Sequence, residues 1–446
     1  MKSPKLFLAI LLSLVAAVAM AAADPCTFTF DTTGAQFNTA GGSSNINVTA
    51  SGTNCSWSVL TFSPFITITS ATNFTGDGTV TYTVADNTNK EQHSSTILMA
   101  GQIYTITQDG FGIQAGNYNG FVVQTNAPSH DSSGAFNLNL RSNGRYTARL
   151  TMGGVRSAFK GNFDGAGNST NTVTRRGLAS LQVIMQTDIF NGANGITGMV
   201  SDGVFTSEVF AVVASFSRTN RCPFQGHYTI VLAPADSSDP TVPQGYGYGT
   251  LTVGRSGRSS LRGALGDGTK IGVSVPVSED GVWPVYELLY KNQGSWFGSI
   301  ALSTNSQFAA AVDWFKPPVA TDHFYTNGFT TALMVTGAVY VSPFSKGPPL
   351  PQSGTVTLGG GNLAGNIMET VAIDSNGIVT VTSTNANDKL AVELVPATGQ
   401  FSGSFLDAGI NQTFTFNGVL VQTNYLGAGL FLGTNESGFV TFDPGP

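Results

Sequence analysis

Short runs in which apolar and polar residues alternate limit the fold of this chain more than any other feature. In the run 79–84, every second residue is Val or Tyr and the residues between them are threonines. Alternation with a period of two is typical of a β-strand that buries one face. Turn-forming pairs such as Asn143-Gly144, Asp267-Gly268 and Asn376-Gly377 separate the runs and favour tight hairpins. The pattern predicts an all-β protein made of short antiparallel strands.

The amino-acid composition agrees with this prediction and argues against one class of partner. Only 10% of the 446 residues are charged, and 54 are glycine. Surface helices are usually rich in Glu, Lys and Arg, and this chain contains few of these residues, so we expect few surface helices. The formal net charge is -6, and the short basic features, Arg175-Arg176 and Arg255, Arg258 and Arg262, form no single basic face. Because phosphate recognition needs clustered Lys and Arg, we expect no nucleic-acid partner.

Residues 1–23 predict an export signal. Lys2 and Lys5 precede an apolar run, 6–20, and small residues then offer two Ala-x-Ala cleavage sites within 19–23. No later segment offers about 18 continuous apolar residues, so we expect no transmembrane helix once the signal is cleaved. The expected location is secreted, extracellular or at the outer cell surface, with the periplasm as a further compartment. A retained N-terminal anchor is the alternative.

The segment 24–110 predicts a compact β-sandwich. Several short alternating runs follow one another, such as 46–50, and this suits two packed sheets. Cys26 and Cys55 lie in this one small module of an exported chain, so we expect them to form a disulfide. The alternative is a pair of reduced, buried thiols. Trp57 is expected to pack in the core near Cys55, with a sugar-stacking platform as its alternative role.

Five motifs follow one another in this segment: Cys26-Thr27-Phe28, Cys55-Ser56-Trp57, Phe65-Ile66-Thr67-Ile68, Gly76-Asp77-Gly78 and Tyr104-Thr105-Ile106. Their order resembles the BACON domain family (Bacteroidetes-associated carbohydrate-binding often N-terminal), immunoglobulin-like modules of secreted bacterial proteins that are thought to bind carbohydrate or mucin. The resemblance implies an immunoglobulin-like sandwich with glycans or mucin as partners. Phe65 stands where members commonly have tryptophan, and His93-Ser94-Ser95 stands where an arginine is common. These departures weaken the inference of a shared ligand.

From residue 115 onward the chain repeats itself. Tyr118, Tyr228 and Tyr340 recur at near-regular spacing, and the segment 118–126 is echoed by 416–424. Repeats of hairpin size predict antiparallel meanders that close into barrels or stack as sandwiches, like β repeats of uncharacterised secreted bacterial proteins. The echo suggests that the last strands return to complete the first sheet, which would remove an exposed edge. The expected units are about 115–225, 226–335 and 336–446.

An outer-membrane barrel has a similar alternation and is an alternative for this region. The chain ends in 439–446 without a terminal aromatic residue, and the region follows a soluble-looking module. These two features favour barrels outside the membrane.

The sequence offers no recognisable catalytic motif. Four histidines are scattered without metal-ligand spacing: His93, His130, His227 and His323. A nucleophile elbow, a P-loop and a dinucleotide fingerprint are absent. Cys222 has no evident partner and is expected to be structural. We therefore expect a protein that is not an enzyme, with no cofactor and no metal.

Two acidic features stand out from this background. Glu287 and Glu369 have apolar neighbours, and burial could raise the pKa of either carboxyl. The alternative, which the sequence favours, is the polar face of a strand. Two oxygen-rich turns, 86–91 and 164–168, could bind calcium, although neither has the spacing of the helix-loop-helix site.

Exposed aromatic rings could stack on sugars, and this gives the candidate carbohydrate-binding residues. They are Trp283, Trp296, Trp314, Tyr246 and Tyr248, with burial in the barrel cores as the alternative. Together with the resemblance, they predict a secreted or cell-surface protein that binds carbohydrate or mucin. A structural cell-envelope scaffold without a specific ligand is the second hypothesis. The sequence does not define an oligomeric state.

Overall fold

The computed structural model describes residues 26–445 except 90, 111, 188–194, 237–238, 306, 384–386 and 424. The expected export signal, 1–23, lies outside the described residues. Regular structure in the described part is β-strand, apart from two short 3-10 segments, η1 (Tyr290–Asn292) and η2 (Pro343–Ser345). The all-β prediction is confirmed. Among these residues no helix has the length and apolar character needed to cross a membrane.

The chain forms two compact units, of which the first comprises the residues up to 87 together with 92–109. It contains a four-stranded sheet in the order β1-β3-β7-β5 and a five-stranded sheet in the order β2-β9-β8-β4-β6. Side chains from both sheets form one core, so the unit is a β-sandwich. Its strands are β1 (Phe28–Phe30), β2 (Gly34–Phe37), β3 (Gly42–Ala50), β4 (Ser56–Thr61), β5 (Ile66–Ile68), β6 (Asn73–Thr75), β7 (Gly78–Val84), β8 (His93–Met99) and β9 (Gln102–Gln108).

A disulfide and a buried tryptophan consolidate this sandwich. Cys26 and Cys55 form the expected disulfide, with their Cα atoms 5.6 Å apart. Trp57, two residues after Cys55, is buried, and its ring stacks on Phe74 with centroids 4.4 Å apart. The indole Nε1 donates a hydrogen bond to the carbonyl of Gly76 at 2.8 Å. Trp57 is therefore a core residue.

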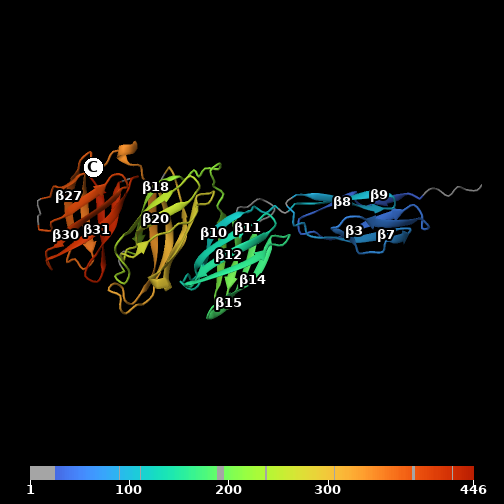
Figure 1. Ribbon diagram of the computed structural model, residues 1–446, viewed down its shortest axis with the longest axis horizontal. Coiled ribbons are helices and arrows are strands. Elements are labelled where there is room, and N and C mark those ends of the chain that lie inside the picture. The colour runs from blue at the N-terminus through green and yellow to red at the C-terminus, as the bar shows by residue number, and fades with distance from the viewer. Residues whose placement is uncertain are drawn as a thin grey trace, which may run out of the picture. The chain divides into compact units, whose positions relative to one another are not determined.

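The second unit, 88–91 with 110–446, contains three eight-stranded antiparallel sheets (Figure 1). Barrel 1 comprises β10 (Gly116–Val123), β11 (Gly134–Leu140), β12 (Arg145–Met152), β13 (Val155–Asn162), β14 (Asn168–Arg175), β15 (Leu178–Thr187), β16 (Gly195–Ser201) and β17 (Thr206–Val213). Barrel 2 comprises β18 (Gly226–Pro234), β19 (Gly247–Val253), β20 (Ser259–Ala264), β21 (Lys270–Ile271), β22 (Val282–Leu289), β23 (Gly294–Ala301), β24 (Phe308–Lys316) and β25 (Phe329–Val339). Barrel 3 comprises β26 (Ser353–Gly360), β27 (Ile367–Ile373), β28 (Val379–Val381), β29 (Ala391–Val395), β30 (Gln400–Asp407), β31 (Gln412–Val421), β32 (Leu426–Leu432) and β33 (Ser437–Pro444).

All three sheets have the same strand order. The first strand of each sheet pairs with the last, which joins β10 to β17, β18 to β25 and β26 to β33. The fourth and fifth strands form the two ends of the sheet. Each sheet is therefore a near-closed up-and-down barrel with one seam, and the prediction of barrel-like repeats is confirmed.

The expected closure of the first sheet by the last strands is wrong. Tyr118 in β10 lies opposite Val213 in β17, within the same barrel. The echoing segment around Phe416 forms β31, the sixth strand of barrel 3, and pairs with β30 and β32. Short hairpin turns favour pairing between sequence neighbours, so each set of eight strands closes locally.

The recurring tyrosines are equivalent in two of the three barrels. The hydroxyl of Tyr118 donates to the carbonyl of Gln114 at 2.7 Å, and that of Tyr228 donates to Phe224 at 2.7 Å. Each ring is buried in the core of its barrel. Tyr340 follows the last strand of barrel 2, and its hydroxyl instead donates to a carbonyl of barrel 3. The regular spacing therefore marks a true repeat only for barrels 1 and 2.

Neighbouring barrels within this unit contact each other directly. The hydroxyl of Thr229 in barrel 2 donates to the buried carbonyl of Leu420 in barrel 3 at 2.7 Å. Val231 from barrel 2 and Val419 from barrel 3 belong to one apolar cluster around this bond. His130 of barrel 1 lies 3.0 Å from the hydroxyl of Ser295 in barrel 2. The three barrels therefore form one continuous unit.

Candidate ligand-binding groove

The outer face of barrel 1 carries two cross-strand rows of polar side chains. Alternation in β10 to β13 turns Tyr and Leu side chains into the core and sends Asn, Thr, Arg and Lys outward. Strand register then sets one row as Asn117, Asn139, Thr147 and Lys160, and the next row as Asn119, Asn137, Arg149 and Ala158. Neighbouring members of a row are cross-strand partners and lie about 5 Å apart.

Hydrogen bonds fix the amides of these rows. Asn139 Nδ2 donates to Asn117 Oδ1 at 2.6 Å, and Asn137 Nδ2 donates to Asn119 Oδ1 at 3.0 Å. A primary amide has two donor hydrogens and an oxygen with two lone pairs. The hydrogen bond within each pair occupies only one of these groups on each amide, so further donors and acceptors remain available. The paired amides therefore present oriented donors and acceptors on an exposed surface.

These rows form the floor of a groove of about 890 Å³. The opposite wall comes from Phe216, which follows barrel 1, and from Ser256, Arg258 and Pro276 of barrel 2. The backbone of Gly254 donates to the carbonyl of Arg258 at 2.8 Å and closes the turn that carries Ser256 and Arg258. Phe216 packs against the core of barrel 2, so the wall is anchored to a barrel.

The groove combines aromatic, amide and cationic side chains. Phe216 is partly exposed there and offers apolar surface. Phe159 turns toward the core of barrel 1, where its ring lies 6.3 Å from that of Tyr146. Arg149, Lys160 and Arg258 line it, and none of the described lining residues is acidic. An open, polar surface of this kind can hold a hydroxyl-rich ligand by several hydrogen bonds at once.

The tryptophans proposed from the sequence lie elsewhere. Trp283, Trp296 and Trp314 have 0% exposed surface and pack in the core of barrel 2. Trp296 Nε1 donates to Glu287 at 3.1 Å, and Trp314 Nε1 donates to the Tyr290 hydroxyl at 3.1 Å. A ring without exposed surface has no face for a sugar, so these three residues are core residues of the folded barrel.

The two candidate tyrosines lie at the contact between barrels 2 and 3. Tyr246 stacks on Phe439 with centroids 5.8 Å apart, and both Tyr246 and Tyr248 pack against the shared apolar cluster. Burial raises the pKa of Tyr248. The structure brings none of the five aromatic candidates into the groove. The residues that line it were missed in the sequence, where the alternating Asn117, Asn119 and Asn137, Asn139 pairs were the available signal.

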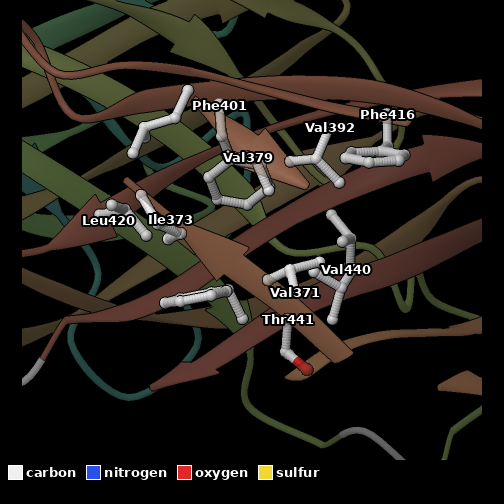
Figure 2. A pocket seen from close by; sticks show the side chains of 12 residues that line it. Val371, Ile373, Val379, Val392, Phe401, Phe416, Leu420, Val440 and Thr441 are labelled. Carbon is white, nitrogen blue, oxygen red and sulfur yellow. The ribbon is translucent and has the colours of Figure 1, made fainter. Parts of the chain in front are cut away.

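The interior of barrel 3 holds a small apolar cavity of about 20 Å³. Val371, Val392 and Phe416 are among the side chains that gather around it, each from a different strand (Figure 2). A volume of this size accommodates at most one water molecule, and an apolar lining keeps such a cavity dry. The cavity is a packing defect of the barrel core and is too small for a sugar.

Glu369 and Glu287 both face barrel interiors, so the polar-face interpretation is wrong for both. Glu369 is 1% exposed, and neither of its carboxyl oxygens has a hydrogen-bond donor among the described residues. Burial, with a further contribution from Asp388, raises the pKa of Glu369 to about 7. Glu287 accepts a hydrogen bond from the backbone of Gly272 at 3.0 Å as well as from Trp296, and so bridges β22 to the residue after β21 across the seam of barrel 2.

One of the two oxygen-rich turns uses its carboxylate within the turn itself. Asp164 Oδ1 accepts hydrogen bonds from the backbone of Ala166 at 3.0 Å and of Asn168 at 2.8 Å, so this carboxylate stabilises its own turn. In the turn 86–91, Lys90 lies outside the described residues. No group of three or more His, Cys, Asp or Glu side chains in the described part of the chain could hold a metal ion.

Comparison with known proteins finds little similarity. No family model and no curated protein matches the chain. Among solved structures, 20% of this chain is similar, at 18% identity and a TM-score of 0.17, to 20% of the chain of a Bacteroides ovatus GH5 xyloglucanase in complex with a XXXG heptasaccharide. A likeness this short and distant carries no inference about fold or function. The groove is therefore interpreted from its own chemistry.

Proposed function

We propose that this protein is a secreted or cell-surface, non-catalytic carbohydrate-binding protein whose groove on barrel 1 receives the glycan. The observation that carries the proposal is the pair of oriented Asn rows on an exposed floor. Sugar hydroxyls both donate and accept hydrogen bonds. A primary amide can accept from a hydroxyl through its oxygen and donate to a hydroxyl through its nitrogen. Phe216 adds apolar surface on which the face of a sugar ring can rest.

The first unit supports the same proposal. Its motifs resemble the BACON family, and its two-sheet sandwich suits that resemblance. The disulfide between Cys26 and Cys55 is typical of a protein that matures in an oxidising compartment, as expected for an exported chain. Secretion and glycan or mucin binding are therefore parts of one consistent proposal.

The test is affinity electrophoresis of the mature chain through gels that contain mucin or a panel of plant and bacterial polysaccharides. We expect retardation by at least one polymer, and we expect the double variant Asn137→Ala, Asn139→Ala to lose most of it. The matched control is Thr172→Ala, Gln182→Ala, because these residues form another exposed cross-strand hydrogen-bonded pair on barrel 1, outside the groove. Equal retardation of both variants would remove the site from the groove.

A structural scaffold is the second candidate. The observation in its favour is the repetition of one barrel topology three times, with direct contact between neighbouring barrels. A scaffold needs no ligand, so absence of retardation with every polymer would favour this candidate.

A further inference from the structure

Within the described part of the chain, the three cations of the groove form no ion pair. Arg149 lies on β12, Lys160 on β13 and Arg258 on the turn of the opposite wall. The ion pairs of Arg175 with Asp202 and of Lys316 with Asp322 lie outside the groove.

This local charge is opposite to that of the whole chain. The sequence contains 26 acidic and 20 basic residues, yet the described lining of the groove contains three basic residues and no acidic ones. A concave surface lined by one sign of charge concentrates the electrostatic potential and attracts ligands of the opposite sign. The basic residues are thus gathered where a ligand would lie.

The positions of the cations suit a repeating anionic ligand. Arg149 lies opposite Ala158, and Lys160 is two residues further along the same strand, so the two cations are diagonal neighbours about 7 Å apart at the backbone. Arg258 lines the same groove from the turn between β19 and β20. The planar guanidinium can bind a carboxylate or a sulfate through two parallel hydrogen bonds, and the lysine ammonium adds a point charge.

We propose that the groove selects anionic polysaccharides, in which a carboxylate or sulfate group recurs along the sugar chain. The inference rests on the proposed function and names its ligand class. The Asn rows bind sugar hydroxyls, and the three cations bind the charged groups. Neutral glycans make only the first set of contacts and therefore bind more weakly.

The experiment measures retardation of the mature chain in gels containing polygalacturonate, chondroitin sulfate or a neutral galactan, at low and at physiological ionic strength. We expect stronger retardation by the two polyanions, and a marked loss of that difference as salt is added. Arg149→Gln and Lys160→Gln should each weaken binding of the polyanion by about fivefold to tenfold, because each removes one charge-assisted contact. They should change binding of the galactan much less.

Arg156→Gln is the matched control, because Arg156 is exposed on the same strand as Lys160 but does not line the groove. Equal weakening by Arg156→Gln would mean that net charge alone attracts the polymer, and this would overturn the inference. Equal binding of galactan and polyanion would also overturn it, while the proposed carbohydrate-binding function would stand. If no polymer retards the chain, both proposals fail. Polygalacturonate carries carboxylates alone, so its retardation of the chain would show that a carboxylate is sufficient for recognition. Chondroitin sulfate carries both groups, so retardation by chondroitin sulfate but not by polygalacturonate would show that sulfate is required.

Discussion

Glu369 places a carboxyl group inside a barrel where no described residue neutralises it. Its neighbours on β27 alternate between core and surface, and Glu369 occupies a core position in line with Val371 and Ile373. Asp388, also buried at 6% exposure, approaches it from the chain before β29. Two carboxylates cannot hydrogen bond to each other, because both are acceptors, but one proton shared between them allows a bond. The pair therefore favours a bound proton.

This burial predicts a pH dependence of stability. The pKa of Glu369 is raised from 4.5 to about 7 in the folded chain. Between these values the folded state keeps a proton that the unfolded chain has released, so the contribution of Glu369 to stability falls as pH rises through this window and levels off above it. Glu369→Gln should therefore melt close to wild type at pH 5 and higher at pH 8, by up to about 3 kcal/mol in the free energy of unfolding.

The measurement is a melting curve of each variant across this range of pH. Glu393→Gln is the control, because Glu393 is exposed on β29 of the same barrel. The prediction is wrong if the difference between Glu369→Gln and wild type is the same at both ends of the range.

At the scale of strands, sequence patterns predict local structure well and long-range closure poorly. The alternating run 79–84 forms most of β7, and Asn143-Gly144 forms the turn between β11 and β12, with the Gly144 backbone donating to Arg141 at 3.0 Å. A turn of known type fixes the register of its hairpin, so the Asn rows were within reach of sequence reasoning. The pairing of β10 with β17 was not, because it depends on how eight strands twist and close together.

In the candidate site, too, some residues can be predicted from local sequence patterns and others depend on the tertiary fold. Its floor comes from four consecutive strands, and the polar positions can be read from their alternation. Its wall comes from Phe216 and Arg258, which reach the groove only through the contact between barrels 1 and 2. The buried tryptophans show that the exposure of a side chain is also hard to predict from sequence. Sequence indicates a large aromatic residue but not whether the fold leaves one of its faces exposed.

Closure of barrel 1 depends on a close approach at Gly120. A methyl group at this position would overlap the carbonyl oxygen of Phe210, which belongs to the partner strand β17. Gly120→Ala should therefore disturb the closing ladder and lower the free energy of unfolding by about 1 to 3 kcal/mol. Gly195→Ala is the control within the same sheet, since its methyl group would lie at an ordinary 3.7 Å from the nearest atom. Urea unfolding of the two variants checks the prediction, and equal midpoints would contradict it.

At the scale of the whole molecule, the two units have separate cores and should respond separately to substitution. The first unit has its own sandwich core and the disulfide, and the second has the cores of the three barrels. Within the second unit, contacts such as Thr229 with Leu420 tie neighbouring barrels together. We therefore expect heating to give a transition for the first unit that is distinct from unfolding of the barrels.

The disulfide offers a way to move one transition alone. Cys55→Ala removes the link to Cys26 and should lower the free energy of unfolding of the first unit by about 3 kcal/mol, because the unfolded segment regains its loop freedom. Calorimetry of the mature chain under oxidising conditions should show the first transition shifted and the barrel transition unchanged. Cys222→Ala is the reciprocal control, since Cys222 is a buried free thiol in barrel 2 and its loss should affect only the barrels. A shift of both transitions by Cys55→Ala would mean that the two units unfold as one cooperative body.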